Sequence, residues 1–141
     1  MCLKKEIRKI KLEESLKVWR KELRIDQKVN IKAKLLSVNF FSLLEHPLET
    51  LGLLLLGGGF VNLLRPYEKK MYKIVIRFPK FSNERTLVHE LAHIKLQHEE
   101  MKKENRFKYL LYACSGKFDD EAENIVMSYK NLLKKRKLML N

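Results

Sequence analysis

The 141-residue sequence predicts a single α+β domain, with helices at both ends and short strands between them. Three observations support this fold class: apolar residues recur at helical spacing near both ends, two central segments are typical of strands, and glycine and proline separate these regions. A chain of this length forms one hydrophobic core. We therefore treat 1–141 as one domain, with a helical part at 1–55 and a core part at 60–133.

The N-terminal part is predicted to contain two helices. Residues 3–25 place apolar side chains at steps of three or four between lysines, arginines and glutamates, which is typical of an amphipathic helix. A second helix is expected at about 27–44. The pair His46-Pro47 ends it, because the residue before a proline avoids the helical conformation.

The longest apolar run, residues 51–64, is interrupted by Gly57-Gly58-Gly59 and is too short to span a bilayer. We expect a buried core segment there and no membrane insertion.

Two strands are expected next, at 60–64 and 72–78, with a hairpin loop at 65–70. The second strand alternates apolar with mixed residues, a half-buried pattern. A helix then begins after Ser82 or Asn83, either of which can cap its first turn.

A last helix is expected at about 119–133, before a basic tail that begins with Lys134-Lys135-Arg136-Lys137. Its apolar stripe recurs at helical spacing and consists of Ala122, Ile125, Val126, Tyr129, Leu132 and Leu133.

The composition describes a basic globular protein with a net charge of +13. Such a charge suits nucleic acid or another anionic partner, but 22 of the 30 cations are lysines, which bind phosphate less specifically than arginine. Cys2 and Cys114 form no disulfide framework, and the N-terminus shows no signal peptide. We therefore expect two reduced thiols in a cytoplasmic protein.

The segment His89-Glu90-Leu91-Ala92-His93 carries the chemistry. Two histidines four residues apart lie on one face of a helix, so both can bind one metal ion, and Glu90 can take a proton from metal-bound water. In a chain of this composition, an accidental H-E-x-x-H is expected with a frequency of only about 1%. The pattern predicts a zinc site with Glu90 as the catalytic residue.

Two imidazoles need a third protein ligand. A longer histidine motif is excluded, because Leu96 and Glu99 stand where metzincins have glycine and histidine. Four acids at the head of the last helix are the alternative, although acids there also stabilise the helix dipole. Asp119 and Glu121 flank the apolar stripe equally, so periodicity leaves both open as the third ligand.

Residues 85–93, preceded by a strand and followed about 25 residues later by an acid–Glu–Ala helix, resemble the ImmA/IrrE-type metallopeptidases and the zincin-like domains of mobile-element antirestriction proteins. The resemblance covers about residues 60–130. It implies a small zincin-like fold, a zinc ion held by His89, His93 and Asp119, and Glu90 as general base. That family usually has glutamate where this chain has Asp119, which keeps Glu121 open as an alternative.

The resemblance also implies a function: limited cleavage of a regulatory protein, such as a phage or mobile-element repressor. The alternative is a catalytically inactive zincin-fold module that regulates or binds nucleic acid, suggested by the aspartate and the basic charge.

A third hypothesis, a SprT-like protease acting at DNA, needs a third histidine ligand, for which only His46 and His98 remain. Candidate donors to an oxyanion are His98, Tyr109 and Tyr112.

Overall fold

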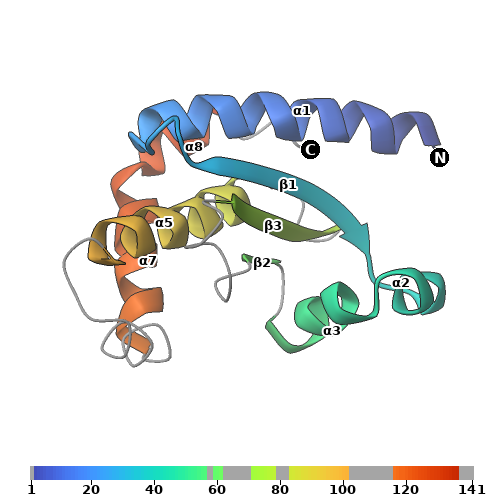
Figure 1. Cartoon of the computed structure of the whole chain (residues 1–141). Coiled ribbons are helices and arrows are strands. Elements are labelled where there is room, and N and C mark those ends of the chain that lie inside the picture. The colour runs from blue at the N-terminus through green and yellow to red at the C-terminus, as the bar shows by residue number, and fades with distance from the viewer. Residues whose placement is uncertain (1, 57–58, 62–70, 79–82, 102–115, 137–141) are drawn as a thin grey trace.

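The computed structural model describes residues 2–56, 59–61, 71–78, 83–101 and 116–136. It has an α+β arrangement in which helices pack around a three-stranded sheet (Figure 1). In chain order the elements are α1 (Cys2–Glu22), β1 (Asn30–Ser37), α2 (Phe40–Glu45), α3 (Pro47–Leu56), β2 (Gly59–Val61), β3 (Met71–Phe78), α5 (Glu84–Met101), α7 (Gly116–Ser128) and α8 (Lys130–Arg136).

The sheet has the strand order β1-β3-β2. The expected pair of central strands is confirmed, since β2 pairs antiparallel with β3, with Gly59 opposite Ile76. β3 covers the predicted 72–78, whereas residues 62–70, with the predicted loop, lie outside the described part of the chain.

The helix predicted at 27–44 is wrong, because residues 30–37 form β1 and pair in parallel with β3. The N-terminal part is therefore not purely helical. Lysine, alanine and leucine favour a helix locally, but pairing with a strand 41 positions away, as in Ile31 opposite Tyr72, satisfies the backbone as a strand. Only the end of the predicted helix survives, as the six-residue α2, which Asn39 caps.

The main core lies between α1, α5 and one face of the sheet. The amphipathic helix predicted at 3–25 is confirmed as α1, which ends at Glu22. Where their side chains are described, most of the apolar residues of α1 from Leu12 onward and of α5 are buried in this core. The fully buried residues of the main core include Leu12, Trp19, Leu23, Ile74, Ile76, Leu87, Val88, Leu91 and Ile94.

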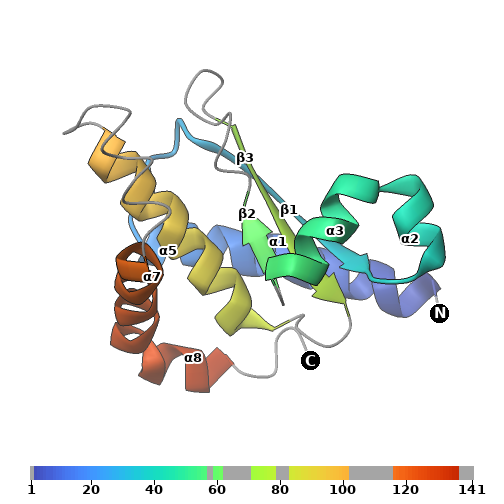
Figure 2. The same cartoon turned by 90° about the horizontal axis from the view of Figure 1, so that it is seen from below.

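The opposite face of the sheet is covered by α3, and Figures 1 and 2 both place α2 and α3 at the far end of the molecule from α7. Leu53 of α3 packs there with Leu36 and Val75 in a small second core. The expectation that 51–64 is a buried core segment is wrong for most of its described leucines. Leu51, Leu54 and Leu55 are exposed, whereas Leu53 is buried as expected.

α5 begins as predicted, with Asn83 as its cap: the Asn83 side-chain oxygen accepts a hydrogen bond from the Thr86 backbone N–H at 2.9 Å. Its first residue, Glu84, is buried and accepts hydrogen bonds from Ser15 and Trp19 of α1, each at 2.9 Å. Arg136 of α8 contacts the same carboxylate at 3.1 Å. Glu84 thus fixes the start of α5 between the N-terminal helix α1 and the C-terminal helix α8.

The final helix predicted at 119–133 begins earlier than expected, at Gly116, and is divided at Tyr129 into α7 and α8. Its predicted apolar stripe is confirmed: Ala122 and Val126 are buried, and the other members pack at the edge of the main core. Within the part of the chain that the structure describes, no helix has the length and apolar character needed to cross a membrane.

A substitution at Gly59 tests how closely β2 approaches α5. A Cβ atom at this position would lie 2.9 Å from Thr86 Cγ2 and 3.3 Å from the Val75 carbonyl oxygen, whereas one at Gly116 would meet nothing within 4 Å. We expect Gly59→Ala to lower the free energy of unfolding by about 1–3 kcal/mol. Gly116→Ala, the matched control, should change it by less than about 1 kcal/mol. Urea unfolding curves measure both, and equal effects would contradict the close approach.

Candidate metal centre

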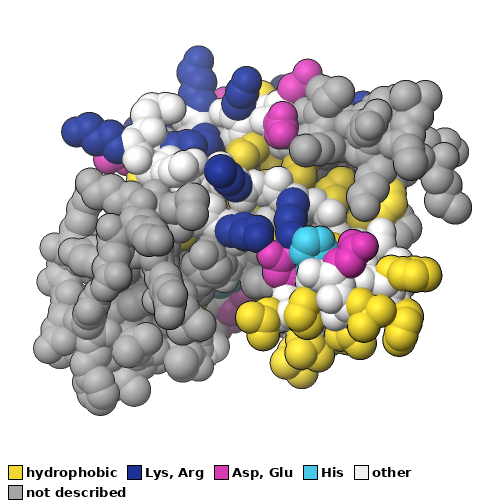
Figure 3. Space-filling view, turned by 45° about the vertical axis from the view of Figure 1, so that its right-hand side comes forward, with side chains coloured by type: hydrophobic (Ala, Val, Ile, Leu, Met, Phe, Trp, Pro, Cys, Tyr) yellow, Lys and Arg dark blue, Asp and Glu magenta, His cyan; other side chains and the backbone are white. Residues whose placement is uncertain are grey.

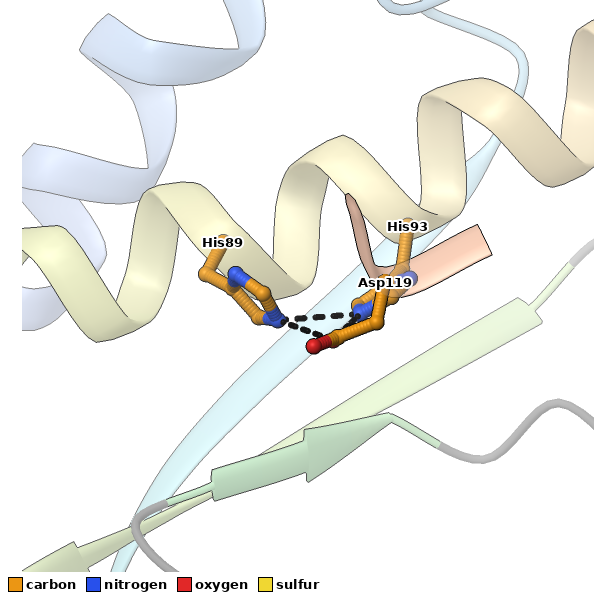
Figure 4. Close-up of side chains that lie close together, drawn as sticks. All are labelled: His89, His93 and Asp119. Carbon is orange, nitrogen blue, oxygen red and sulfur yellow. Dashed lines mark hydrogen bonds and ion pairs between the residues drawn. The ribbon is translucent and has the colours of Figure 1, made fainter. Parts of the chain in front are cut away.

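The two histidines of the H-E-x-x-H segment lie one turn apart on the side of α5 that faces α7 (Figure 4). Their Nε2 atoms are 3.0 Å apart, and the two rings meet edge to face with centroids 4.6 Å apart. The opposite side of α5 is buried in the core through Leu87, Leu91 and Ile94, and the imidazoles point toward α7. Helix packing therefore brings two nitrogen ligands to one point.

Asp119, in the first turn of α7, completes a group of three donors. Its Oδ1 lies 3.0 Å from His89 Nε2 and 3.3 Å from His93 Nε2. A tetrahedral zinc ion with bonds of about 2.0–2.2 Å separates its ligands by roughly 3.3 Å. The three donors thus have the spacing and chemistry that such an ion requires, and the side of Asp119 open to solvent leaves room for water.

His93 has the protonation state that metal binding needs. Burial, followed by the nearby His89, lowers the pKa of His93 to about 4, although Asp119 and Glu123 oppose the shift. The ring is therefore neutral at pH 7, with a lone pair available. Phe118 packs against it with ring centroids 4.5 Å apart and helps to fix its orientation. The Nδ1 atom of His93 is buried and has no hydrogen-bond partner among the residues described.

His89 is oriented by a residue that the sequence reasoning missed. Its Nδ1 donates a hydrogen bond to Glu123 Oε1 at 2.8 Å, and Arg85 contacts the other Glu123 oxygen at 3.1 Å. A carboxylate behind a histidine fixes the tautomer that presents Nε2 to a metal. Spacing could have revealed it, because Glu123 lies four residues after Asp119 and therefore on the same face of α7.

Glu90 is buried between α5 and the sheet and is 6% exposed. Burial raises its pKa to about 7, with a smaller upward contribution from Asp119, and His89 acts against the shift. β2 borders this side chain, since a Cβ atom at Gly59 would lie 3.7 Å from Glu90 Cγ. A carboxyl group that titrates near neutral pH can both accept and return a proton.

The remaining candidates are placed less favourably or lie outside the description. Glu121 is not in the three-donor group: it lies about 200° from Asp119 around α7, so the two acids cannot both face α5. His46 caps the end of α2, away from this site. The His98 side chain, Tyr109 and Tyr112 fall outside the described residues.

Comparisons of the chain with models of protein families, with curated proteins and with solved structures found no match.

The choice of third ligand leads to a direct test. We expect Asp119→Asn to weaken zinc binding by at least about 100-fold, because it removes a charged donor between the two imidazoles. Asp120→Asn, an identical change at the exposed neighbouring position, and Glu121→Gln should each leave the affinity within about threefold. Competition against a zinc-binding dye measures the affinities. A larger loss with Glu121→Gln than with Asp119→Asn would show that the ligand is Glu121.

The pKa shifts of Glu90 and His93 give opposite pH dependences in metal-free protein. Between its ordinary pKa of 4.5 and the folded value of about 7, Glu90 keeps its proton only when folded, so stability falls as pH rises. Between about 4 and the ordinary 6.5, His93 is protonated only when unfolded, so stability rises with pH.

Glu90→Gln removes the falling contribution and leaves the rising one. In the presence of a chelator, we expect the free energy of unfolding of this variant to rise by roughly 1–3 kcal/mol more than that of the wild type between about pH 4 and 6.5. Urea unfolding at several pH values measures the difference. Parallel pH profiles for the two proteins would contradict the burial of Glu90 as a neutral acid.

Proposed function

We propose that this protein is a zinc-dependent metallopeptidase. The observation that carries the proposal is the convergence of His89, His93 and Asp119, with three donor atoms all within 4.8 Å of one another, beside the buried carboxyl group of Glu90. Two nitrogens and one carboxylate oxygen are the ligand set of thermolysin-like sites, which keep a fourth position for water.

His89, His93 and Asp119 would hold the zinc ion. When bound, zinc acidifies a water molecule toward a pKa of about 7 and polarises a carbonyl group. Glu90 takes the proton of the attacking water and returns it to the leaving amine, a role suited to a carboxyl group shielded from solvent. The Glu123 carboxylate holds His89 in the ligating tautomer, and Arg85 holds Glu123.

The position of β2 favours an extended peptide as substrate. β2 forms one edge of the sheet, and in the described part of the chain it pairs with β3 alone. A peptide can add to such an edge through backbone hydrogen bonds, independently of its sequence. Because β2 passes beside Glu90, a peptide bound along it would have its backbone close to the general base.

The resemblance of residues 85–93 and of the acid–Glu–Ala helix to ImmA/IrrE-type enzymes supports a narrower proposal. We infer a zincin-like architecture and limited cleavage of a regulatory protein in the cytoplasm, such as a phage or mobile-element repressor. The third ligand departs from that family's usual glutamate. Asp119 is one methylene shorter, and the 3.0 and 3.3 Å contacts indicate that α7 lies close enough to α5 for it to reach.

A second candidate is a metal-binding module that regulates or binds nucleic acid without hydrolysis. It is favoured by the net charge of +13 and by the exposed Lys134 and Lys135 in the last turn of α8. Both candidates predict bound zinc, so only hydrolysis separates them.

The decisive experiment combines zinc analysis with a peptide-cleavage assay. Zinc-loaded protein is incubated with a proteome-derived peptide library, and new termini are counted by mass spectrometry. We expect one zinc per chain in wild type and in Glu90→Gln, with cleavage reduced by about 10²- to 10⁴-fold in the variant. Retained zinc without cleavage in either protein would favour the non-hydrolytic module, and wild-type protein without zinc would end both proposals.

A further inference from the structure

The exposed hydrophobic side chains are concentrated in one segment. Of the large hydrophobic residues that are exposed in the described part of the chain, all but Met127 belong to α2 and α3. Figure 3 shows hydrophobic side chains gathered at one corner of the molecule. We call these residues the apolar face; its members are Phe40, Phe41, Leu43, Leu44, Leu48, Leu51, Leu54 and Leu55.

The apolar face is held rigidly on the body of the protein. Asn39 caps α2, with its side-chain oxygen 2.8 Å from the Ser42 backbone nitrogen, and the Ser42 hydroxyl donates to the Ser37 carbonyl oxygen. Leu53 is fully buried in the second core, and Glu49 is paired with lysines of β1 and β3. The inward side of the two helices is therefore anchored, and their apolar residues project outward from a fixed base.

The exposed side of α3 carries a stripe of leucines of the kind that normally packs against another surface. Leu48, Leu51 and Leu55 repeat at i, i+3 and i+7, so they form a stripe along α3. They are 83%, 46% and 82% exposed, although such a stripe is normally buried. At roughly 100 Å² each, the eight side chains amount to about 800 Å², which is what one partner contributes to a standard protein interface.

The charge distribution favours a second copy of this chain as the partner of the apolar face. Residues 35–64 contain no lysine or arginine, although these two types supply 30 of the 141 residues. An anionic bilayer or an acidic protein would be met by cations within the face, as in membrane-surface helices. Two chains of charge +13 repel each other. The apolar face contains no cation, and the adjacent Lys34 and Lys73 are paired with Glu49, so two copies can meet there with least repulsion.

We propose that the apolar face binds the same face of a second copy, forming a two-fold dimer. In an isologous contact each stripe is its own complement, so Leu48 and Leu55 of one chain pack against the apolar face of the other. Because α2 and α3 lie at the opposite end from α7 in both views, the dimer leaves the candidate metal centre of each chain open (Figures 1 and 2).

Sedimentation equilibrium of the full chain tests this. We expect a concentration-dependent dimer, and the double variant Leu48→Gln, Leu55→Gln should raise its dissociation constant by at least about tenfold. Met127→Gln changes a 51% exposed side chain outside the face and should leave the constant within about twofold. Circular dichroism checks that all three proteins keep the same helix content.

Added salt and lipid vesicles separate the proposed dimer from the alternative partners. Raising NaCl from about 0.05 to 0.5 M should tighten the dimer, because it screens the repulsion between the two charges of +13. A dimer that dissociates with added salt, or a chain that stays monomeric at every concentration, would overturn the proposal. Flotation of monomeric protein with phosphatidylserine vesicles, abolished by the double variant, would overturn it in favour of a membrane surface.

Discussion

The packing of α5 is the constraint on which the rest of the molecule depends. This helix contacts α1, the sheet and α7, so most of its surface is committed to the core. Glu84 fixes its first turn through hydrogen bonds from Ser15 and Trp19, and Asn83 caps it. With the rotation of the helix set in this way, His89 and His93 have one direction in which to point. The site is thus a consequence of the core.

The sequence predicts the parts of this arrangement that depend on local pattern. The H-E-x-x-H helix with its cap, the strand at 72–78 and the stripe of the last helix follow from periodicity and capping chemistry. β1 does not follow from local pattern, because residues 30–37 contain helix-favouring lysine, alanine and leucine. Polar and apolar residues alternate only from Asn30 to Lys34, before the pair Leu35-Leu36. The strand conformation of these residues depends on hydrogen bonds to β3, which is far away in the chain. A local sequence pattern does not reveal such hydrogen bonds.

The candidate metal centre likewise has residues that local sequence predicts and one that depends on how two helices pack. His89, Glu90 and His93 are close in sequence because one helix carries them, whereas the position of Asp119 depends on how α7 crosses α5. The apolar stripe of α7 leaves Asp119 and Glu121 equivalent, and only the helix crossing distinguishes them. The same crossing brings Glu123 to His89. The four-residue spacing links Asp119 with Glu123, since the candidate ligand and the carboxylate that contacts His89 share one face of α7.

Placing the site on a core helix has a thermodynamic consequence. Burial holds Glu90 toward its protonated form and His93 toward its neutral form, so the metal-free protein carries two groups that would be better solvated if it were unfolded. A cation between His89, His93 and Asp119 would favour the ionised state of Glu90 and use the lone pair of His93. Binding to the folded chain alone would then add stability by mass action. The buried groups whose ionisation lowers stability are therefore those that would couple folding to metal binding. Leucine and valine side chains do not ionise or bind a metal, so they could not provide this coupling.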